Sequence, residues 1–179
     1  MNPARVLGIV GWSGSGKTIL ITRMIPVLAR QGVRVATLKH AHHSFDVDQP
    51  GKDSYEHRKA GACEVIISSA RRWAQMHELG ESPELTLAQL LAKVSACDLV
   101  LIEGFKAERH PKLEVYRSSL GKAPLHLSDR QILGVATDTL SLSANVPLID
   151  LNDVAAVACF ALEHAQPIAQ VIGTLSATE

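Results

Sequence analysis

Short runs of apolar and β-branched residues recur along the chain, with stretches of helical periodicity between them. Several of these runs are apolar at every position instead of alternating with polar residues. Such runs are typical of strands that are buried on both faces of a parallel sheet. The predicted strands are Val6–Val10, Val33–Leu38, Glu64–Ser68, Leu99–Glu103, Leu113–Tyr116, Ile132–Ala136 and Pro147–Ile149.

Helices are predicted in the gaps between these strands. The first, Lys17–Gln31, carries Ile21, Ile25 and Leu28 on one face and ends at Gly32. The others begin after Asp53, at Ser82-Pro83-Glu84 and after Asn152, and the last stops before Pro167.

The alternation of strand and helix predicts an α/β three-layer sandwich with a mostly parallel sheet. The 179 residues fit a single domain, without internal repeats, linkers or low-complexity segments. Residues 106–128 are the least regular part and are interpreted as an irregular or antiparallel insertion. Residues 167–179 form a tail that either docks or frays.

Composition narrows the function further. Lys+Arg and Asp+Glu are balanced at 18 each, so no global basic field favours nucleic acid. No apolar stretch approaches the ~20 residues that cross a bilayer, and Val6–Val10 leads into Gly11 instead of a signal-peptide cleavage site. We therefore expect a cytoplasmic protein without nucleic-acid or membrane partners. Cys63, Cys97 and Cys159 are interpreted as small, buried, reduced side chains, because they form no CxxC pair.

The phosphate-binding pattern GxxxxGK[ST] is matched in full by the segment Gly11-Trp12-Ser13-Gly14-Ser15-Gly16-Lys17-Thr18. A predicted strand precedes it and an amphipathic helix follows, which is the context that a P-loop requires. Several backbone N–H groups must reach phosphate oxygens at once, and glycine permits the tight wrap and the close approach. The expected nucleotide-binding residues of this loop are Gly11, Ser13, Gly14, Ser15, Gly16, Lys17 and Thr18.

To bind a triphosphate, this site needs a cationic side chain and a metal ion. Lys17 is expected to reach the β- and γ-phosphates, and the hydroxyl of Thr18 is a hard oxygen ligand for Mg²⁺. A carboxylate is expected at the carboxyl end of another strand, where open parallel sheets bind ligands. Glu103 ends its strand, whereas Asp98 begins it about 17 Å away at ~3.3 Å per residue. We therefore predict a bound nucleoside triphosphate, with catalytic roles for Lys17 and Glu103 and with Thr18 and Glu103 as magnesium ligands.

A long polar loop follows the second predicted strand, at the edge of the sheet that should hold the triphosphate. In one interpretation Lys39, Asp48 and Asp53 touch the magnesium shell or the γ-phosphate and the loop acts as a switch. In another the loop is only solvated, and Asp53 is the N-cap of the next helix.

A third interpretation makes the same loop a transition-metal site. His40, His42 and His43 with Asp46 offer suitable ligands. Because His42 and His43 are adjacent, they would point apart in an extended loop, which weakens a chelate.

Two further strand ends carry candidate residues. Ser69 and the following Arg71-Arg72 are placed to meet a phosphate or a partner's anion, or form a solvated basic turn. Asp138 follows the strand Ile132–Ala136, where a carboxylate can accept both N–H groups of guanine's Watson–Crick edge; it is equally suited to a turn. No NKxD guanine-recognition motif occurs, so the residues favour guanine over adenine only weakly.

Taken together, these motifs resemble the molybdopterin-guanine dinucleotide biosynthesis adapter protein family (MobB family) over about residues 5–150. The resemblance rests on Gly8-Ile9-Val10-Gly11 through Thr18, Thr37-Leu38-Lys39-His40, Pro50-Gly51-Lys52-Asp53-Ser54-Tyr55, His57-Arg58-Lys59-Ala60-Gly61-Ala62 and Leu101-Ile102-Glu103-Gly104-Phe105-Lys106.

The resemblance implies a P-loop protein that binds GTP with magnesium, hydrolyses it weakly and forms a homodimer. It also implies a partner, the guanylyltransferase that attaches GMP to molybdopterin during molybdenum-cofactor assembly. The P-loop residues and Glu103 carry over from the family directly, followed by Asp48 and Asp53. A P-loop small-molecule kinase and a metallochaperone-like NTPase that uses the histidine loop are the alternative functions.

Overall fold

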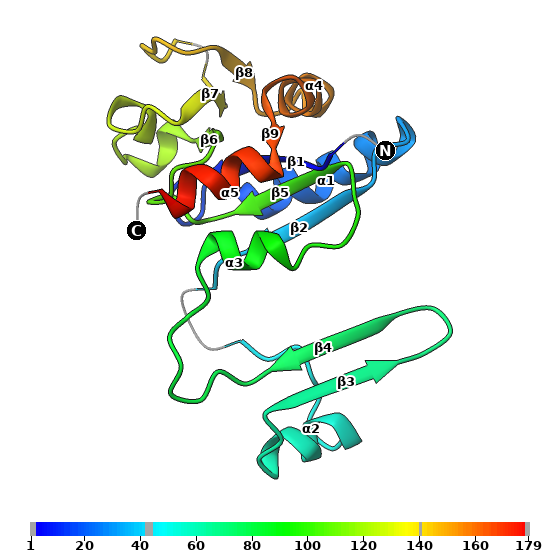
Figure 1. Ribbon diagram of the computed structural model, residues 1–179. Coiled ribbons are helices and arrows are strands. Elements are labelled where there is room, and N and C mark those ends of the chain that lie inside the picture. Colours follow the sequence, from blue (N-terminus) through cyan, green and yellow to red (C-terminus); the bar gives the residue numbers. More distant parts are fainter. Residues whose placement is uncertain (1–2, 42–44, 140, 178–179) are drawn as a thin grey trace. The chain divides into compact units, whose positions relative to one another are not determined.

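The computed structural model describes residues 3–41, 45–139 and 141–177 (Figure 1). The chain divides into two compact units. The first consists of Met1–His40 together with Leu87–Glu179, and the second of Ala41–Thr86. The interpretation of residues 1–179 as a single domain stays a prediction.

A mostly parallel sheet forms the centre of the first unit, as the sequence predicted. Within the described residues its strands follow the order β2-β5-β1-β6-β7-β8, and every neighbouring pair in this row is parallel. A short strand, β9, pairs antiparallel with the start of β1. The strands are β1 (Arg5–Val10), β2 (Val35–Lys39), β5 (Leu99–Glu103), β6 (Lys112–Tyr116), β7 (Ile132–Thr137), β8 (Leu148–Asp150) and β9 (Gln166–Pro167).

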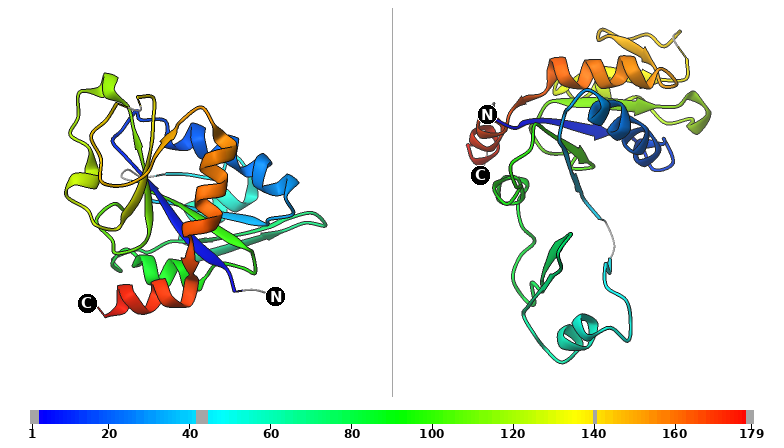
Figure 2. Two further views of the ribbon diagram at one scale, coloured as in Figure 1. Left: turned by 90° about the horizontal axis from the view of Figure 1, so that it is seen from above. Right: turned by 90° about the vertical axis from the view of Figure 1, so that its right-hand side faces the viewer.

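Helices cover both faces of this sheet, which makes the predicted three layers. Figure 2 shows α1 beside α4 and α3 beside α5. Successive side chains of a strand point to opposite faces. Leu7 of β1 accordingly packs in the core cluster of α1 and α4, and Val6 in that of α3 and α5. The helices are α1 (Lys17–Arg30), α3 (Leu87–Ala92), α4 (Val154–His164) and α5 (Ile168–Ser176).

The antiparallel alternative for residues 106–128 is wrong. Strand β6 lies inside this segment and pairs in parallel with both β1 and β7. Two charged residues interrupt its apolar pattern, yet both are buried because the following loop satisfies them: Lys112 contacts Asp129 at 2.7 Å, and Glu114 accepts the backbone N–H of His126 at 2.9 Å. The rest of the segment is irregular, with 3₁₀ turns at Ser118–Leu120 and Leu125–Leu127.

The tail after Pro167 docks. Its nine residues Ile168–Ser176 form α5, whose Val171 and Leu175 are buried against α3 and β1. The sequence left this choice open because the segment begins at a proline and carries no charged residue before Glu179 to mark an exposed face.

The second unit contains helix α2 (Asp53–Lys59) and an antiparallel hairpin of β3 (Glu64–Ser68) and β4 (Trp73–His77). The predicted strand Glu64–Ser68 therefore forms, but it is not part of the parallel sheet. The chain turns back immediately, because Ser69 donates its backbone N–H to Arg72 O at 2.9 Å. Asp53 is the first residue of α2 and Lys52 its N-cap, without a side-chain capping bond, so the expected N-cap at Asp53 is wrong.

Two further expectations came from the composition: the burial of the cysteines and the lack of a membrane-spanning helix. Cys97 is buried, but Cys63 and Cys159 are exposed, so the prediction of three buried cysteines is wrong for two of them. None of the helices in the described part of the chain is both long and apolar enough to span a bilayer. The cytoplasmic location stays a prediction.

A substitution at Gly8 of β1 tests how closely this strand packs against His110, which precedes β6 in the chain. A Cβ at this position would lie 2.3 Å from Nε2 of His110, which is 1% exposed. Burial, and then the neighbouring Lys112, lowers the pKa of His110 to about 3, so the ring is neutral. We expect Gly8→Ala to lower the free energy of unfolding by about 1–3 kcal/mol, because overpacking forces the ring to shift.

Urea-induced unfolding measures this loss. The double variant Gly8→Ala/His110→Ala is expected to recover most of it, because the collision is removed. Gly173→Ala is the matched control, since a Cβ there meets nothing within 4 Å inside α5. A Gly8→Ala protein as stable as the parent would contradict this packing.

Candidate nucleotide-binding site

The segment between β1 and α1 has the conformation that its glycines permit. Gly14 and Gly16 have φ angles of 80° and 97°, in the left-handed region that favours glycine. A Cβ on Gly11 would lie 2.4 Å from the backbone oxygen of Val115, so no larger residue fits there. The chain therefore wraps tightly before α1, and Gly14 and Gly16 place no side chain in the way of a ligand.

Lys17 folds back over this loop. Its Nζ donates to the carbonyl oxygens of Gly11 and Trp12, each at 2.9 Å. Burial is the main cause that lowers the pKa of Lys17; Glu103 opposes this effect, whereas Lys106 and Lys39 add to it. The ammonium group is thus held at the mouth of the loop by acceptors that a phosphate can replace.

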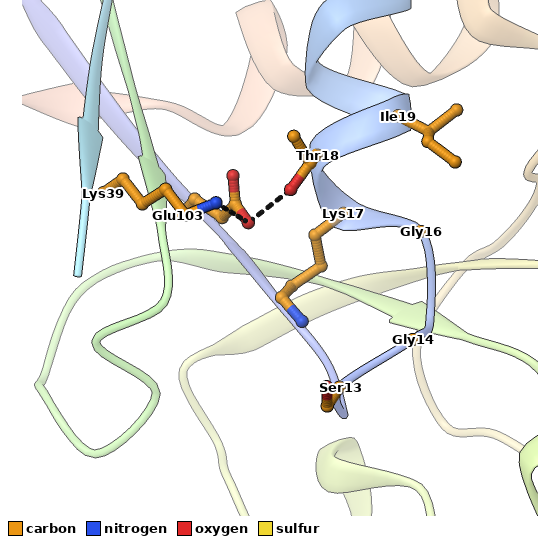
Figure 3. A pocket seen from close by; sticks show the side chains of 8 residues that line it. All are labelled: Ser13, Gly14, Gly16, Lys17, Thr18, Ile19, Lys39 and Glu103. Atoms are coloured by element: carbon orange, nitrogen blue, oxygen red, sulfur yellow. Dashed lines mark hydrogen bonds and ion pairs between the residues drawn. The ribbon is translucent and has the colours of Figure 1, made fainter. Parts of the chain in front are cut away.

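The residues predicted to meet the γ-phosphate and the magnesium ion come together across three strand ends (Figure 3). Thr18 at the start of α1 donates its hydroxyl to Oε1 of Glu103 at 2.7 Å. Lys39 at the end of β2 places its Nζ 3.3 Å from the same oxygen. These contacts follow from the sheet order, because β5 lies between β1 and β2 and pairs Lys39 directly with Glu103.

A cavity of about 380 Å³ opens over these groups, within the usual range of small-ligand sites. Its lining contains two cations and one anion, so its charge suits an anionic ligand that brings a metal ion. Ser15 is not part of the lining; its side chain is buried, and its Oγ has no hydrogen-bond partner among the described residues. The cavity is lined by Ser13, Gly14, Gly16, Lys17, Thr18, Ile19, Lys39 and Glu103.

Asp98 lies at the opposite end of β5 from Glu103, as expected from the length of the strand. Its carboxylate accepts the backbone N–H of Arg34 at 2.8 Å and two guanidinium contacts from the same residue. The hydrogen bonds to Arg34 lower the pKa of Asp98. Asp98 therefore ties β5 to the start of β2 and is separate from the cavity.

Asp48 and Asp53 belong to the second unit, so their expected contact with the γ-phosphate stays a prediction. Asp48 accepts the hydroxyl of Ser54 at 2.9 Å and lies 3.5 Å from Nε of Arg58. Hydrogen bonds to Glu78 and then Asp46 raise the pKa of Arg58. Within its own unit, Asp48 thus helps to hold the loop before α2 against that helix.

The reason for placing Ser69 at the phosphate edge does not hold. That reason required β3 to be a strand of the parallel sheet, whereas β3 pairs with β4 in the second unit. The hydroxyl of Ser69 closes the hairpin turn by donating to the carbonyl oxygen of Arg72 at 3.0 Å. A role for Ser69 in binding nucleotide has no structural argument left.

The histidine loop lies only partly within the described residues. His42 and His43 lie outside the described residues, so the transition-metal interpretation stays untested for them. His40 packs against Phe105, with ring centroids 4.7 Å apart and the rings tilted by 37°. Among the described residues, no group of three His, Cys, Asp or Glu side chains is arranged to hold a metal ion.

Asp138 follows β7 and has partners within the chain. Its Oδ1 accepts the backbone N–H of Ser118 at 3.3 Å, and its Oδ2 lies 3.4 Å from Nη1 of Arg117. The same guanidinium donates through Nε to the backbone oxygen of Ser15 at 3.0 Å. Sequence reasoning missed Arg117, because only the pairing of β6 with its neighbours brings it to the P-loop.

Residues before and after β6 brace the P-loop from outside, and the sequence did not predict these contacts either. The indole N–H of Trp12 donates to the carbonyl oxygen of Ala123 at 2.8 Å, and Lys106 lies 4.6 Å from the centre of the indole ring. A Cβ on Gly14 would lie 3.7 Å from Leu120. The aromatic residue inside the P-loop was the available signal for this contact, since an indole N–H usually finds a partner.

Comparisons with known proteins agree with the motifs. The family described as molybdopterin guanine dinucleotide synthesis protein B matches residues 6–138. A molybdopterin-guanine dinucleotide biosynthesis adapter protein of Escherichia coli (strain K12) is 44% identical over 90% of this chain and 93% of its own. Its counterpart in Haemophilus influenzae is 41% identical over 89% of this chain and 88% of its own.

A solved structure supports the same relationship. The crystal structure of a molybdopterin-guanine biosynthesis protein B (mobB) superimposes with a TM-score of 0.66 at 32% identity, covering 88% of this chain and 97% of that one. On the match to the family and the identity to relatives of similar length, this chain belongs to the molybdopterin guanine dinucleotide synthesis protein B family.

Proposed function

We propose that this protein is a GTP-binding adapter that assists the attachment of GMP to molybdopterin in molybdenum-cofactor biosynthesis. One observation carries the nucleotide part of the proposal: a complete P-loop opens onto a cavity in which Lys17, Lys39, Thr18 and Glu103 converge. Cations, a hydroxyl and a carboxylate at a helix N-terminus suit a metal-bound triphosphate and no neutral ligand.

The oxygen atoms in this cavity fit Mg²⁺. Thr18 Oγ1 and Glu103 Oε1 are 2.7 Å apart. Adjacent ligands of an octahedral magnesium at about 2.1 Å are about 3.0 Å from each other, so a small movement suffices. The metal would neutralise phosphate charge, while Thr18 and Glu103 hold it and Lys17 and Lys39 contact phosphate oxygens.

Hydrolysis by this site is expected to be slow. The residues that line the cavity include two lysines but neither an arginine nor a glutamine. An arginine that stabilises the transition state and a residue that orients water are the groups that accelerate GTP hydrolysis by orders of magnitude. The described lining residues therefore favour the binding of phosphate over the hydrolysis of GTP, as we expect for an adapter.

The partner part of the proposal rests on the relatives. The matching proteins of E. coli and H. influenzae carry the name adapter protein for molybdopterin-guanine dinucleotide biosynthesis. An adapter acts on an enzyme, and the enzyme whose chemistry uses GTP in this pathway is the molybdenum cofactor guanylyltransferase. We also propose a homodimer, as the resemblance to the family implies.

A pull-down with purified guanylyltransferase, with and without GTP and Mg²⁺, tests this function. We expect retention of the guanylyltransferase that changes with nucleotide. Phosphate release from GTP alone, without phosphorylated product in metabolite mixtures, separates the adapter from a small-molecule kinase. Sedimentation of the protein alone reports the dimer. No association in either nucleotide state would refute the adapter role.

Asp138 is proposed to read the guanine base. We expect Asp138→Asn to lower the affinity for GTP by about tenfold and leave that for ATP unchanged, because an amide cannot accept two N–H donors as a carboxylate does. Competition between GTP and ATP for a fluorescent nucleotide measures this ratio. The matched control is Glu163→Gln, which changes an exposed carboxylate on α4 that contacts Cys159. An unchanged ratio in Asp138→Asn would remove Asp138 from base recognition.

A further inference from the structure

Arg117 lies between the groups assigned to the two ends of the nucleotide. Its Nε donates to the backbone oxygen of Ser15 in the P-loop at 3.0 Å, and its Nη1 is 3.4 Å from Oδ2 of Asp138. The backbone N–H of the next residue, Ser118, donates to the other oxygen of Asp138 at 3.3 Å. The carboxylate is thus held on both oxygens by two consecutive residues, one of which also holds the P-loop.

The sheet order explains this position. Strand β6 lies between β1, which leads into the P-loop, and β7, which leads into Asp138. A residue just after β6 is therefore next to both. The Nη2 atom of Arg117 is 3.6 Å from where a Cβ on Gly16 would be, so the guanidinium lies along the loop. A planar guanidinium can serve two acceptors in fixed directions, which a lysine ammonium cannot.

On the basis of the proposed function, we propose that Arg117 is a positioning residue that couples guanine recognition to phosphate binding. It fixes Asp138 relative to the P-loop, so that one GTP molecule can engage both. The two contacts to Asp138 are longer than the one to Ser15. Each oxygen of the carboxylate accepts one of these contacts and has a second lone pair, so the two N–H groups of guanine can bond to Asp138 while Arg117 and Ser118 keep it in place.

The variant Arg117→Lys tests this role, since it keeps the positive charge and removes the two-way geometry. Affinities for GTP, ATP and inorganic tripolyphosphate are measured with Mg²⁺. We expect tripolyphosphate affinity to stay within about twofold, and GTP affinity to fall about tenfold toward the value of Asp138→Asn. In the double variant Arg117→Lys/Asp138→Asn, no further loss is expected, because both changes break one coupled unit.

Arg30→Lys, at the far end of α1, is the matched control and should change none of these affinities. Equal losses of GTP and tripolyphosphate in Arg117→Lys would overturn the inference, because they would mean that Arg117 only supports the loop. A GTP-to-ATP ratio lowered by Asp138→Asn but not by Arg117→Lys would also overturn it. If thermal unfolding shows that Arg117→Lys is poorly folded, Arg117→Gln, which keeps an N–H donor for Ser15, gives the same comparison.

Two results with the parent protein would contradict the proposed function itself, independently of the Arg117 variants. Parent protein that binds neither GTP nor tripolyphosphate contradicts the phosphate site. Parent protein that binds tripolyphosphate but does not prefer GTP to ATP contradicts the assignment of Asp138, and with it the coupling.

Discussion

Lys17→Ala is expected to weaken GTP binding by about 150-fold, because a hydrogen bond between charged groups contributes up to about 3 kcal/mol. Among the described residues, the ammonium group donates hydrogen bonds to the carbonyl oxygens of Gly11 and Trp12. Burial lowers the pKa of Lys17, so the free site holds the cation at some cost. A phosphate that replaces these two carbonyl oxygens forms an ion pair with Lys17. This ion pair is lost in Lys17→Ala.

The fold is expected to survive this change, since Lys17 is only partly buried and its hydrogen bonds to other described residues are those to two carbonyl oxygens of the same loop. Thermal unfolding checks that the variant is native, and equilibrium binding of labelled GTP measures the loss. Lys93→Ala is the matched control, because Lys93 is an exposed lysine of the same unit, beyond α3. Undiminished binding by a folded Lys17→Ala protein would show that the triphosphate lies elsewhere.

Glu103→Gln is expected to remove the magnesium dependence of GTP binding. Glutamine has the same shape and can still accept the hydroxyl of Thr18, so the site should keep its structure. Without the carboxylate, magnesium affinity should fall by at least about 10–100-fold, the range known for groups that merely support a metal ligand. Slow GTP hydrolysis should fall with it, because the metal would neutralise the charge that develops on the leaving GDP.

Without magnesium, Glu103→Gln is expected to have the opposite effect on the affinity for GTP. The carboxylate of Glu103 repels phosphate unless a metal lies between them. In excess chelator, Glu103→Gln should therefore bind GTP as well as the parent or better, and with magnesium more weakly. Asp98→Asn is the matched control at the other end of β5, where the lost charge contacts Arg34. Equal magnesium dependence in Glu103→Gln and the parent would exclude Glu103 from the metal site.

The sequence predicted the gathering of Lys17, Thr18, Lys39 and Glu103 because general rules govern it. Fully apolar runs indicated parallel strands, and the carboxyl ends of parallel strands meet at one edge. Lys39 and Glu103 each end a strand, and the structure pairs them directly. The motif placed the remaining two at the start of the helix after β1.

The same rules failed where the chain leaves the sheet. Ser69 was placed at the phosphate edge because Glu64–Ser68 resembles a strand of the main sheet, but a strand's sequence does not specify its partner. Its partner, β4, alternates only weakly, and Trp73 in it is 63% exposed. Pairing in a local hairpin therefore decided the position of Ser69, and no single-sequence pattern distinguishes this pairing from a central strand.

Arg117 could not be found from the sequence for a related reason. Its importance comes from lying after β6, between β1 and β7, and the sequence does not give the order of strands in a sheet. The charged Lys112 and Glu114 also hid the central position of β6, because their burial depends on partners in a later loop.

Equilibrium dialysis of the parent protein against labelled GTP, with and without Mg²⁺, tests the central claim most directly. The account predicts one nucleotide per chain, bound more tightly with magnesium and displaced by tripolyphosphate. Absence of binding under both conditions, or bound GTP that tripolyphosphate does not displace, would contradict it.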